Sequence, residues 1–287
     1  MHVDSETHRT SIGTSVDLTS FSTTPPSPTD ENEINSMVAR NLERITELQK
    51  KLRAEEQAGL LVILLAVDTG GKDETIEEVF GVLDLRGSGV EKFGKASETE
   101  AKHDFLWRFH QVAPGKGEIV IFNRSHYDEI TEPWTRGEID EATRKMRYEH
   151  IRAFEKLLTD SDIHILKLHF RVSREEQARR VLKRLENPEL QHEFSPNDID
   201  VQRQWDTYQT AFQEILTETS AENAPWYVIP ADDHPYRRFM ASTLTLQALE
   251  AIGPEYPAPV EDIQQYRQEL ADASDGAVPS SGDAQPQ

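Results

Sequence analysis

One apolar run, residues 59–67 (GLLVILLAV), constrains the fold of this 287-residue chain more than any other segment. The run is far too short to span a bilayer. Its unbroken apolar character over the length of a strand predicts a strand that is buried on both faces, as in a parallel sheet. Runs of the same kind recur at 118–123, 163–172 and 226–231. The sequence therefore predicts a parallel sheet at the core of the protein.

Segments with apolar residues at helical spacing alternate with these runs. The clearest is 31–56, which carries Ile34, Val38 and Leu42 on one face. Further helices are predicted at 74–83, 98–112, 138–158, 174–185, 199–219 and 236–252. Alternating strands and helices indicate an α/β fold with a doubly wound, mainly parallel sheet flanked by helices. Ligands bind such sheets beyond the carboxyl ends of the strands, so the residues after each strand are the candidates for chemistry.

The net charge of -21 argues against a protein that coats nucleic acid, and at first sight against any polyanionic substrate. Eleven of these charges lie in segments 1–33 and 254–287, which are poor in apolar residues and which we expect to be disordered acidic tails. Residues 34–253 then form one domain. The absence of cysteine excludes disulfides and thiolate metal sites and favours a cytoplasmic location, and no run predicts a membrane span.

The turn after the first strand has the composition of a phosphate-binding loop. It runs from Asp68 to Asp73 (DTGGKD) and leads into a predicted helix. Its two glycines let backbone N–H groups approach phosphate oxygens, and Lys72 can reach a terminal phosphate. The match to G-x-x-x-x-G-K-[ST] is partial, because Ala66 and Asp73 replace the first Gly and the Ser/Thr. Asp68 can hold Mg²⁺ or steer an attacking phosphoryl oxygen; a plain surface turn that Asp68 caps is the alternative.

The second strand ends in a further polar group of candidate site residues. Asn123 offers a neutral oxygen ligand, Arg124 can neutralise phosphoryl charge through a bidentate contact, and Asp128 can supply a carboxylate to a metal ion. Arg124 in an ion pair with a core acid is the alternative. We expect His126 to be a packed, hydrogen-bonded histidine.

Two predicted helices carry further candidate arginines. Asp104 and Arg108 share a helix face at i and i+4, which fits either a local ion pair or a phosphate contact by Arg108. Arg180 and Arg184 share a face of the helix at 174–185. Such a pair can close over transferred phosphates as a mobile lid does, and a solvated basic helix is an equal alternative.

Together these segments resemble the polyphosphate kinase 2 family over about residues 52–259. The matching stretches are 68–76 (DTGGKDETI), 103–110 (HDFLWRFH), 117–127 (GEIVIFNRSHY), 173–185 and 224–232 (APWYVIPAD). The resemblance implies a P-loop-kinase-like fold with a helical lid at about 174–198. It implies phosphoryl transfer between inorganic polyphosphate and nucleoside mono- or diphosphates, such as AMP, ADP or GDP. It also implies Mg²⁺ (or Mn²⁺) as cofactor and a homodimer or homotetramer.

The resemblance implies functional roles for Asp68, Lys72, Asn123, Arg124, Arg180 and Arg184. With the residue-level reasoning above, we expect catalytic roles for Asp68, Lys72, Arg124, Arg180 and Arg184. Phosphate or nucleotide contacts are expected from Thr69, Gly70, Gly71, Lys72, Asp73, Arg108 and Asn123. Metal contacts are expected from Asp68, Asn123 and Asp128.

The stretches that the family uses along the polymer differ in this chain. Gly94 stands where a lysine is usual, and residues 190–194 (LQHEF) contain no Lys or Arg. Each lost cation weakens the binding of a polyanion, by analogy with nucleic acid. Two alternatives therefore stay open: an ATP-dependent nucleotide kinase, and a non-catalytic nucleotide- or phosphate-binding protein on the same scaffold.

Overall fold

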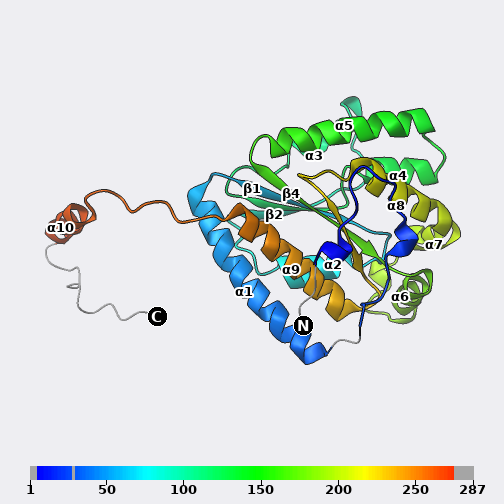
Figure 1. Cartoon of the computed structure of the whole chain (residues 1–287), viewed down its shortest axis with the longest axis horizontal. Helices are drawn as coiled ribbons and strands as arrows, with labels where there is room; N and C mark the ends of the chain where they lie inside the picture. Colours follow the sequence, from blue (N-terminus) through cyan, green and yellow to red (C-terminus); the bar gives the residue numbers. More distant parts are fainter. Residues whose placement is uncertain (1–4, 28–29, 275–287) are drawn as a thin grey trace. The chain divides into compact units, whose positions relative to one another are not determined.

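The computed structural model describes residues 5–27 and 30–274. The chain divides into two compact units, Met1–Glu255 and Tyr256–Gln287. The strands of the first unit are β1 (Gly59–Leu65), β2 (Ser88–Lys92), β3 (Ile119–Asn123), β4 (Ile163–Arg171) and β5 (Trp226–Pro230). They form a parallel sheet in the order β2-β3-β1-β4-β5 (Figure 1). The predicted α/β fold with a parallel sheet is therefore confirmed.

Strand β1 lies at the centre of the sheet because every one of its side chains is apolar and buried. It pairs with β3 at Leu60↔Ile119 and with β4 at Leu60↔His164. The connection after β1 leads towards β2 at one edge, whereas the connection after β4 leads to β5 at the other. The connections thus run to opposite edges of the sheet on either side of β1. In α/β sheets of this type, ligands bind beyond the carboxyl end of the strand where the connections diverge.

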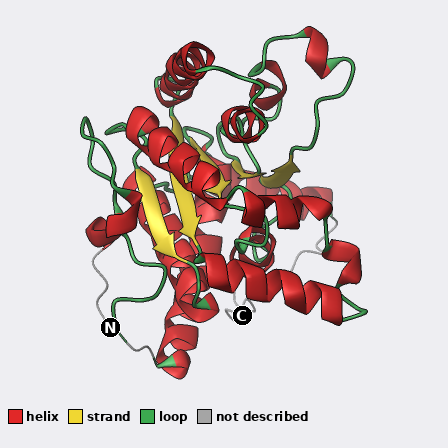
Figure 2. Cartoon of the chain, turned by 90° about the vertical axis from the view of Figure 1, so that its right-hand side faces the viewer, coloured by secondary structure: helices red, strands yellow, loops and turns green. Residues whose placement is uncertain are grey.

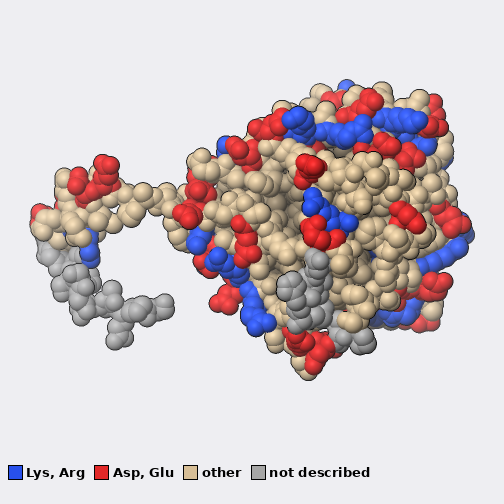
Figure 3. Space-filling view, viewed as in Figure 1, with Lys and Arg blue, Asp and Glu red and all other residues tan. Residues whose placement is uncertain are grey.

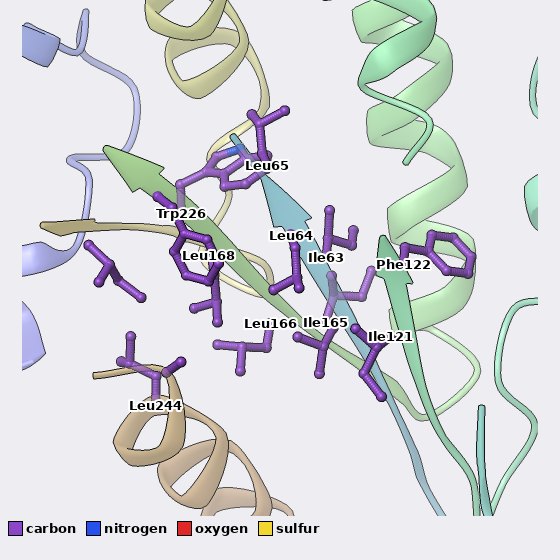
Figure 4. Packing of buried hydrophobic residues seen from close by; sticks show 14 of the residues in the cluster. Ile63, Leu64, Leu65, Ile121, Phe122, Ile165, Leu166, Leu168, Trp226 and Leu244 are labelled. Carbon is purple, nitrogen blue, oxygen red and sulfur yellow. The ribbon is translucent and has the colours of Figure 1, made fainter. Parts of the chain in front are cut away.

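Helices cover both faces of the sheet. Helix α1 (Glu31–Glu55) packs along α9 (His234–Ile252) on one face, and α5 (Glu141–Thr159) and α8 (Trp205–Thr219) lie on the other (Figure 1). Figure 2 shows helices on both sides of the strands. The core between these layers is apolar. Figure 4 shows Leu168 of β4 on the side of the sheet where Leu244 of α9 lies, whereas Trp226 of β5 points to the opposite side. There its indole N–H donates to the Thr219 hydroxyl of α8 at 2.9 Å.

Several predicted elements differ from the observed ones. Strand β2 escaped prediction because it is a half-exposed edge strand without an apolar run. Segment 98–112 is not one helix: it contains a 3₁₀ turn at Glu100–Lys102 and a single helical turn, α3 (Trp107–His110). Between them, the Asp104 carboxylate accepts the Leu106 N–H at 3.0 Å, a local bond that competes with helix formation.

Further helices lie near the carboxyl ends of the strands. They are α2 (Lys72–Thr75), continued by a π-helical turn at Ile76–Phe80, α4 (Asp128–Thr135), α6 (Arg174–Glu186) and α7 (Pro196–Arg203). Helix α4 contains Pro133, a residue that usually marks a helix break. The predicted helix at 199–219 is divided into α7 and α8 at Gln204.

Residues 5–27, which we expected to belong to a disordered tail, instead pack on the domain. His8 is buried, and its Nδ1 donates to the Val228 carbonyl at 3.0 Å. Val16 and Leu18 enter the hydrophobic core. A few apolar side chains spaced along a polar segment therefore suffice to dock it, although its composition resembles that of a disordered chain. Residues 1–4 and 28–29 lie outside the described residues.

The second unit contains one described helix, α10 (Ile263–Ala273), where we expected a disordered tail. Its apolar side chains Ile263, Tyr266 and Leu270 are exposed. The rest of that expected tail, 275–287, lies outside the described residues. None of the helices within residues 5–27 and 30–274 is long and apolar enough to cross a membrane.

Candidate active site

The loop between β1 and α2 forms a tight turn that only glycine can make at two positions. The Gly70 N–H donates to the Val67 carbonyl at 3.0 Å. A Cβ on Gly70 would lie 2.6 Å from the Ala66 Cβ, and a Cβ on Gly71 would lie 2.1 Å from Nη1 of Arg237. Gly71 also has a φ of +99°. Both glycines are therefore required for the loop to close against its surroundings.

Thr69 holds the most unusual backbone conformation of this loop. Its φ is +65°, which a β-branched residue rarely adopts. Its hydroxyl is buried and has no hydrogen-bond partner within the described part of the chain. Backbone strain and an unsatisfied polar atom in one loop are typical of a binding site in which the ligand supplies the hydrogen-bond partner.

Lys72 lies buried at the base of this loop. Its ammonium turns back and donates to the carbonyls of Ala66 at 2.9 Å and Val67 at 3.1 Å. Burial lowers the pKa of Lys72, and the carboxylates of Asp68 and Asp128 partly oppose this effect. The ammonium is thus held at the end of β1 by neutral acceptors, and no carboxylate within residues 5–27 and 30–274 bonds to it.

Asp68 and Arg124 connect the ends of β1 and β3. Arg124 Nη2 donates to Asp68 Oδ1 at 3.1 Å, and Asn197 Nδ2 donates to Asp68 Oδ2 at 2.7 Å. Burial opposes ionisation of Asp68, but Lys72, Arg124 and the Asn197 bond outweigh it, so the pKa is lowered. Arg124 has a φ of +61°, and its Nη1 donates to Glu132 at 3.1 Å. The Arg124 guanidinium therefore lies between the carboxylates of Asp68 and Glu132.

Asp128 lines the same pocket as Asp68, together with Arg124, Glu132 and other residues. Its Oδ2 accepts the Ser125 N–H at 2.7 Å, and burial raises its pKa to about 6. The carboxylates of Asp68 and Asp128 suit Mg²⁺, which commonly binds to one or two carboxylates and takes its other ligands from water and substrate phosphates. Within residues 5–27 and 30–274 there is no cluster of three or more His, Asp or Glu that would form a complete metal cage.

Asn123 and Asp73 form a separate group at the carboxyl ends of β2 and β3. Asn123 Nδ2 donates to Asp73 Oδ1 at 2.5 Å, and Lys92 donates to the same oxygen at 3.4 Å. Asn123 does not line the pocket that holds Asp68 and Asp128. The structure thus does not bring the three predicted metal contacts together: Asp68 and Asp128 share a pocket, and Asn123 faces Asp73.

Arg180 of α6 contacts the loop. Its Nη1 donates to the Thr69 carbonyl at 3.0 Å, its Nη2 to the Ala231 carbonyl, and its Nε to Glu176 at 2.7 Å. Only 14% of its side chain is exposed. The guanidinium therefore joins the ends of β1 and β5 through backbone carbonyls and one carboxylate.

Arg184, one turn further along α6, has acidic partners instead. Its Nη2 lies 3.3 Å from Glu193 Oε2, and its Nη1 lies 3.6 Å from Asp198 Oδ2. Glu193 is the acid within the segment that we noted as lacking Lys and Arg. Segment 174–198 thus folds onto the loop with Arg180 in contact with it, while Arg184 is neutralised by acids of the same segment.

Arg108 lies in a different cavity. Its guanidinium packs over Phe93 and Phe109, donates to the Gly94 carbonyl at 2.8 Å and pairs with Glu129. It does not form the ion pair with Asp104 that its spacing permitted. The cavity has a volume of about 610 Å³ and includes the rings of His103 and Phe105 in its lining. The structure thus separates Arg108 from the Lys72 loop.

Sequence reasoning missed several residues that contact these groups, among them Glu132, Asn197 and Arg237. Asn197, at the start of α7, bonds Asp68, and no local pattern marks it. Arg237 of α9 is buried with 1% of its surface exposed and lies against Gly71. The pair Arg237-Arg238 in a helix that packs on the sheet was the available signal. His126 is buried and bonds Glu155 at 3.2 Å, as expected of a packed histidine.

Two cations of this site, Lys72 and Arg180, lie largely inside the molecule, whereas the side chain of Arg124 is 31% exposed. Lys72 is only 8% exposed. On the face drawn in Figure 3, Lys and Arg are mixed with Asp and Glu over α1, α5 and α6. The net charge of -21 is a sum over the whole chain and does not by itself prevent an anion from binding at the loop.

Comparison with known proteins gives a consistent result. The family model "Polyphosphate kinase 2 (PPK2)" matches residues 29–256. An AMP/ADP-polyphosphate phosphotransferase of Meiothermus ruber is 43% identical over 216 residues, which cover 75% of this chain and 81% of that protein. An ADP-polyphosphate phosphotransferase of Rhodopseudomonas palustris is 32% identical, covering 94% and 99%. The crystal structure of Polyphosphate Kinase 2 from Arthrobacter aurescens TC1 superposes with a TM-score of 0.89 at 31% identity, covering 93% and 96%. The chain belongs to the polyphosphate kinase 2 family.

Proposed function

We propose that this protein is an enzyme that transfers phosphoryl groups between inorganic polyphosphate and nucleoside mono- or diphosphates with the help of Mg²⁺. The observation that carries the proposal is the pocket beyond the carboxyl end of β1, where Asp68, Arg124 and Asp128 meet beside the Lys72 loop. Relatives at 43% and 32% identity carry the names of such phosphotransferases.

The residues of the site suit a reaction that depends mostly on positioning and electrostatics. Lys72 and the amides of residues 69–72 would hold the transferred phosphate, because the partners of the Lys72 ammonium in the described part of the chain are two carbonyls that it can release. Arg124 would move from Asp68 towards the phosphate and spread its developing charge. A magnesium ion held by Asp68 and Asp128 would neutralise further phosphate charge.

We place the nucleotide in the cavity near Arg108. Its volume of about 610 Å³ suits a small-molecule ligand, and its lining combines the rings of His103 and Phe105 with the cations Arg108 and Arg147. Aromatic faces can stack on a base, and the arginines can pair with phosphate. The substitution Phe105→Ala should therefore raise the KM for the nucleotide more than the KM for polyphosphate.

A parallel turnover assay tests the function. Purified protein is incubated with Mg²⁺ and AMP, ADP or GDP, and with either long-chain polyphosphate or ATP as the donor. We expect polyphosphate-dependent formation of nucleoside di- or triphosphate that stops when EDTA is added. Turnover with ATP alone would instead identify an ATP-dependent nucleotide kinase. That alternative is favoured by the Arg184–Glu193 pair, which removes one cation from a polymer path. Calorimetric nucleotide binding without turnover would identify a non-catalytic binding protein.

We further propose that the enzyme works as a homodimer or homotetramer in the cytoplasm. Exposed apolar side chains at Leu85 and Val90, beside the edge strand β2, support self-association. The absence of cysteine is compatible with a reducing compartment. Light scattering coupled to size-exclusion chromatography would give the subunit number directly.

A further inference from the structure

Arg237 is a buried arginine directly behind the phosphate loop. Its exposed fraction is 1%, its Nε donates to the Thr75 hydroxyl at 3.2 Å, and its buried Nη2 has no hydrogen-bond partner in the described residues. The guanidinium packs on Gly71 so closely that a Cβ there would lie 2.1 Å from Nη1. Because Gly71 has no side chain, the Arg237 guanidinium can contact the backbone of the loop.

The charge of Arg237 has no counter-charge in contact with it. Among the described residues, no carboxylate oxygen lies within 4.0 Å of its guanidinium; Glu74 and Glu78 act on it only from further away. Burial lowers its pKa to about 10, so it remains charged at neutral pH. Arg180, a like charge, lies near enough to act on it. Buried charges in proteins are normally paired, so this arrangement calls for an anion that completes it.

We propose that Arg237 is a positioning residue for phosphate, and that its counter-charge is the phosphate chain bound on the other side of the Gly71 backbone. This inference rests on the proposed function of the loop. It assigns to the loop a buried cation, Arg237, in addition to Lys72. Arg237 would act through its field and by fixing Gly71, without touching the reacting atoms. In a buried site, solvent screens such a charge little, so it still acts across one backbone layer.

This role predicts opposite effects on the free and the bound protein. Removing an unpaired buried charge should leave the free protein as stable or make it more stable, whereas binding of a polyanion should weaken. An arginine that only supports the fold predicts the reverse: its loss would lower stability and leave phosphate binding unchanged. The two roles therefore differ in the sign of the stability change.

Arg237→Met removes the charge at similar length, Arg237→Lys keeps the charge, and Arg238→Met is the matched control on the next position of α9. Thermal midpoints are measured without ligand and with long-chain polyphosphate, and with ATP and Mg²⁺ in parallel; KM and kcat are measured for each donor. For Arg237→Met we expect an unchanged or higher midpoint without ligand, a smaller ligand-induced shift and a KM for polyphosphate raised roughly tenfold. Arg237→Lys should recover most of the shift, and Arg238→Met should resemble the unmodified protein.

An Arg237→Met protein that fails to fold, or that has a lower free midpoint with an undiminished ligand shift, overturns the proposal. Failure of the proposed function looks different. In that case the unmodified protein neither responds to polyphosphate nor turns it over, and the ATP arm then decides. Loss of the ATP-induced shift in Arg237→Met would still support the assignment of Arg237 to phosphate, and an undiminished shift would overturn it.

Discussion

Two groups of charged side chains include residues of the segment after β3, one almost fully buried and one partly exposed. The anchor cluster consists of His126, Tyr127, Glu155 and Lys167, and the site cluster consists of Asp68, Lys72, Arg124 and Asp128. In the anchor cluster, Lys167 donates to Glu155 at 2.8 Å and to the Thr219 carbonyl at 2.7 Å. Tyr127 donates to the same carboxylate, and all four side chains are almost fully buried.

The site cluster contains the second buried lysine, and this lysine lacks such a partner. Among the described residues, Lys72 bonds to backbone carbonyls alone, whereas Lys167 bonds to a carboxylate. A closed ion pair fixes the polypeptide in one arrangement, because breaking it leaves a buried charge alone. A cation without a bonded carboxylate can still form an ion pair with an anion that enters the site. We therefore expect Lys167 to stabilise the fold around Glu155 and Lys72 to bind an anionic ligand.

The largest expected effect is that of Lys72→Met on turnover. The charge that meets the phosphate is lost, so we expect kcat to fall about a thousandfold, the upper range for one electrostatic contact. The free energy of unfolding should change by no more than about 2 kcal/mol, because the loss of two carbonyl bonds is partly offset by the removal of a buried charge. Steady-state kinetics and urea denaturation check this. Near-normal kcat in the purified variant would contradict the assignment of Lys72 to the reaction.

The same substitution at the other lysine should have the opposite profile. Lys167→Met leaves Glu155 buried without its partner, and we expect the protein to lose about 3 kcal/mol of stability. The folded fraction should keep kcat within about tenfold, because no atom of the cluster faces the phosphate pocket. Urea denaturation and kinetics at low temperature, beside Lys72→Met as the matched control, test the comparison. Equal stability losses in both variants would show that the two lysines have the same role.

A double substitution tests whether the anchor cluster acts as a pair. Glu155→Gln combined with Lys167→Met removes both charges, so it should restore at least about 1 kcal/mol relative to Lys167→Met alone. The coupling energy from the four unfolding curves measures the effect. Simple additivity of the two single substitutions would mean that Lys167 is held by the Thr219 carbonyl more than by Glu155.

The smallest expected effect concerns the acid that shares Arg124 with Asp68. Glu132→Gln weakens one of the two contacts that hold the guanidinium at 3.1 Å, so Arg124 should become more available to phosphate. We expect the KM for polyphosphate to fall two- to fivefold, in line with the modest energies of half-exposed ion pairs. An unchanged KM in initial-rate measurements would show that Asp68 alone restrains Arg124.

The parts of the molecule that could be predicted from sequence are those with local signals. Strands β1, β3, β4 and β5 are apolar runs, and the Lys72 loop is marked by its glycines. Strand β2 has no such signal, because an edge strand need not be apolar. Asn197 and Arg237 reach the loop across 129 and 162 positions of sequence, so their contacts depend on the finished fold. Composition likewise could not predict docking of residues 5–27, which depends on a few well-placed side chains.

The docking of residues 5–27 also has a consequence for biosynthesis. His8 is translated 220 positions before its partner Val228 in β5. Val16 and Leu18 contact α8, through Thr217 and Gln213, so both residues lack these partners until α8 has been synthesised. Contacts of such long range close late, because the intervening chain must first become ordered. The bond from His8 to Val228 therefore forms only in a nearly completed protein, and its appearance would time the last step of folding.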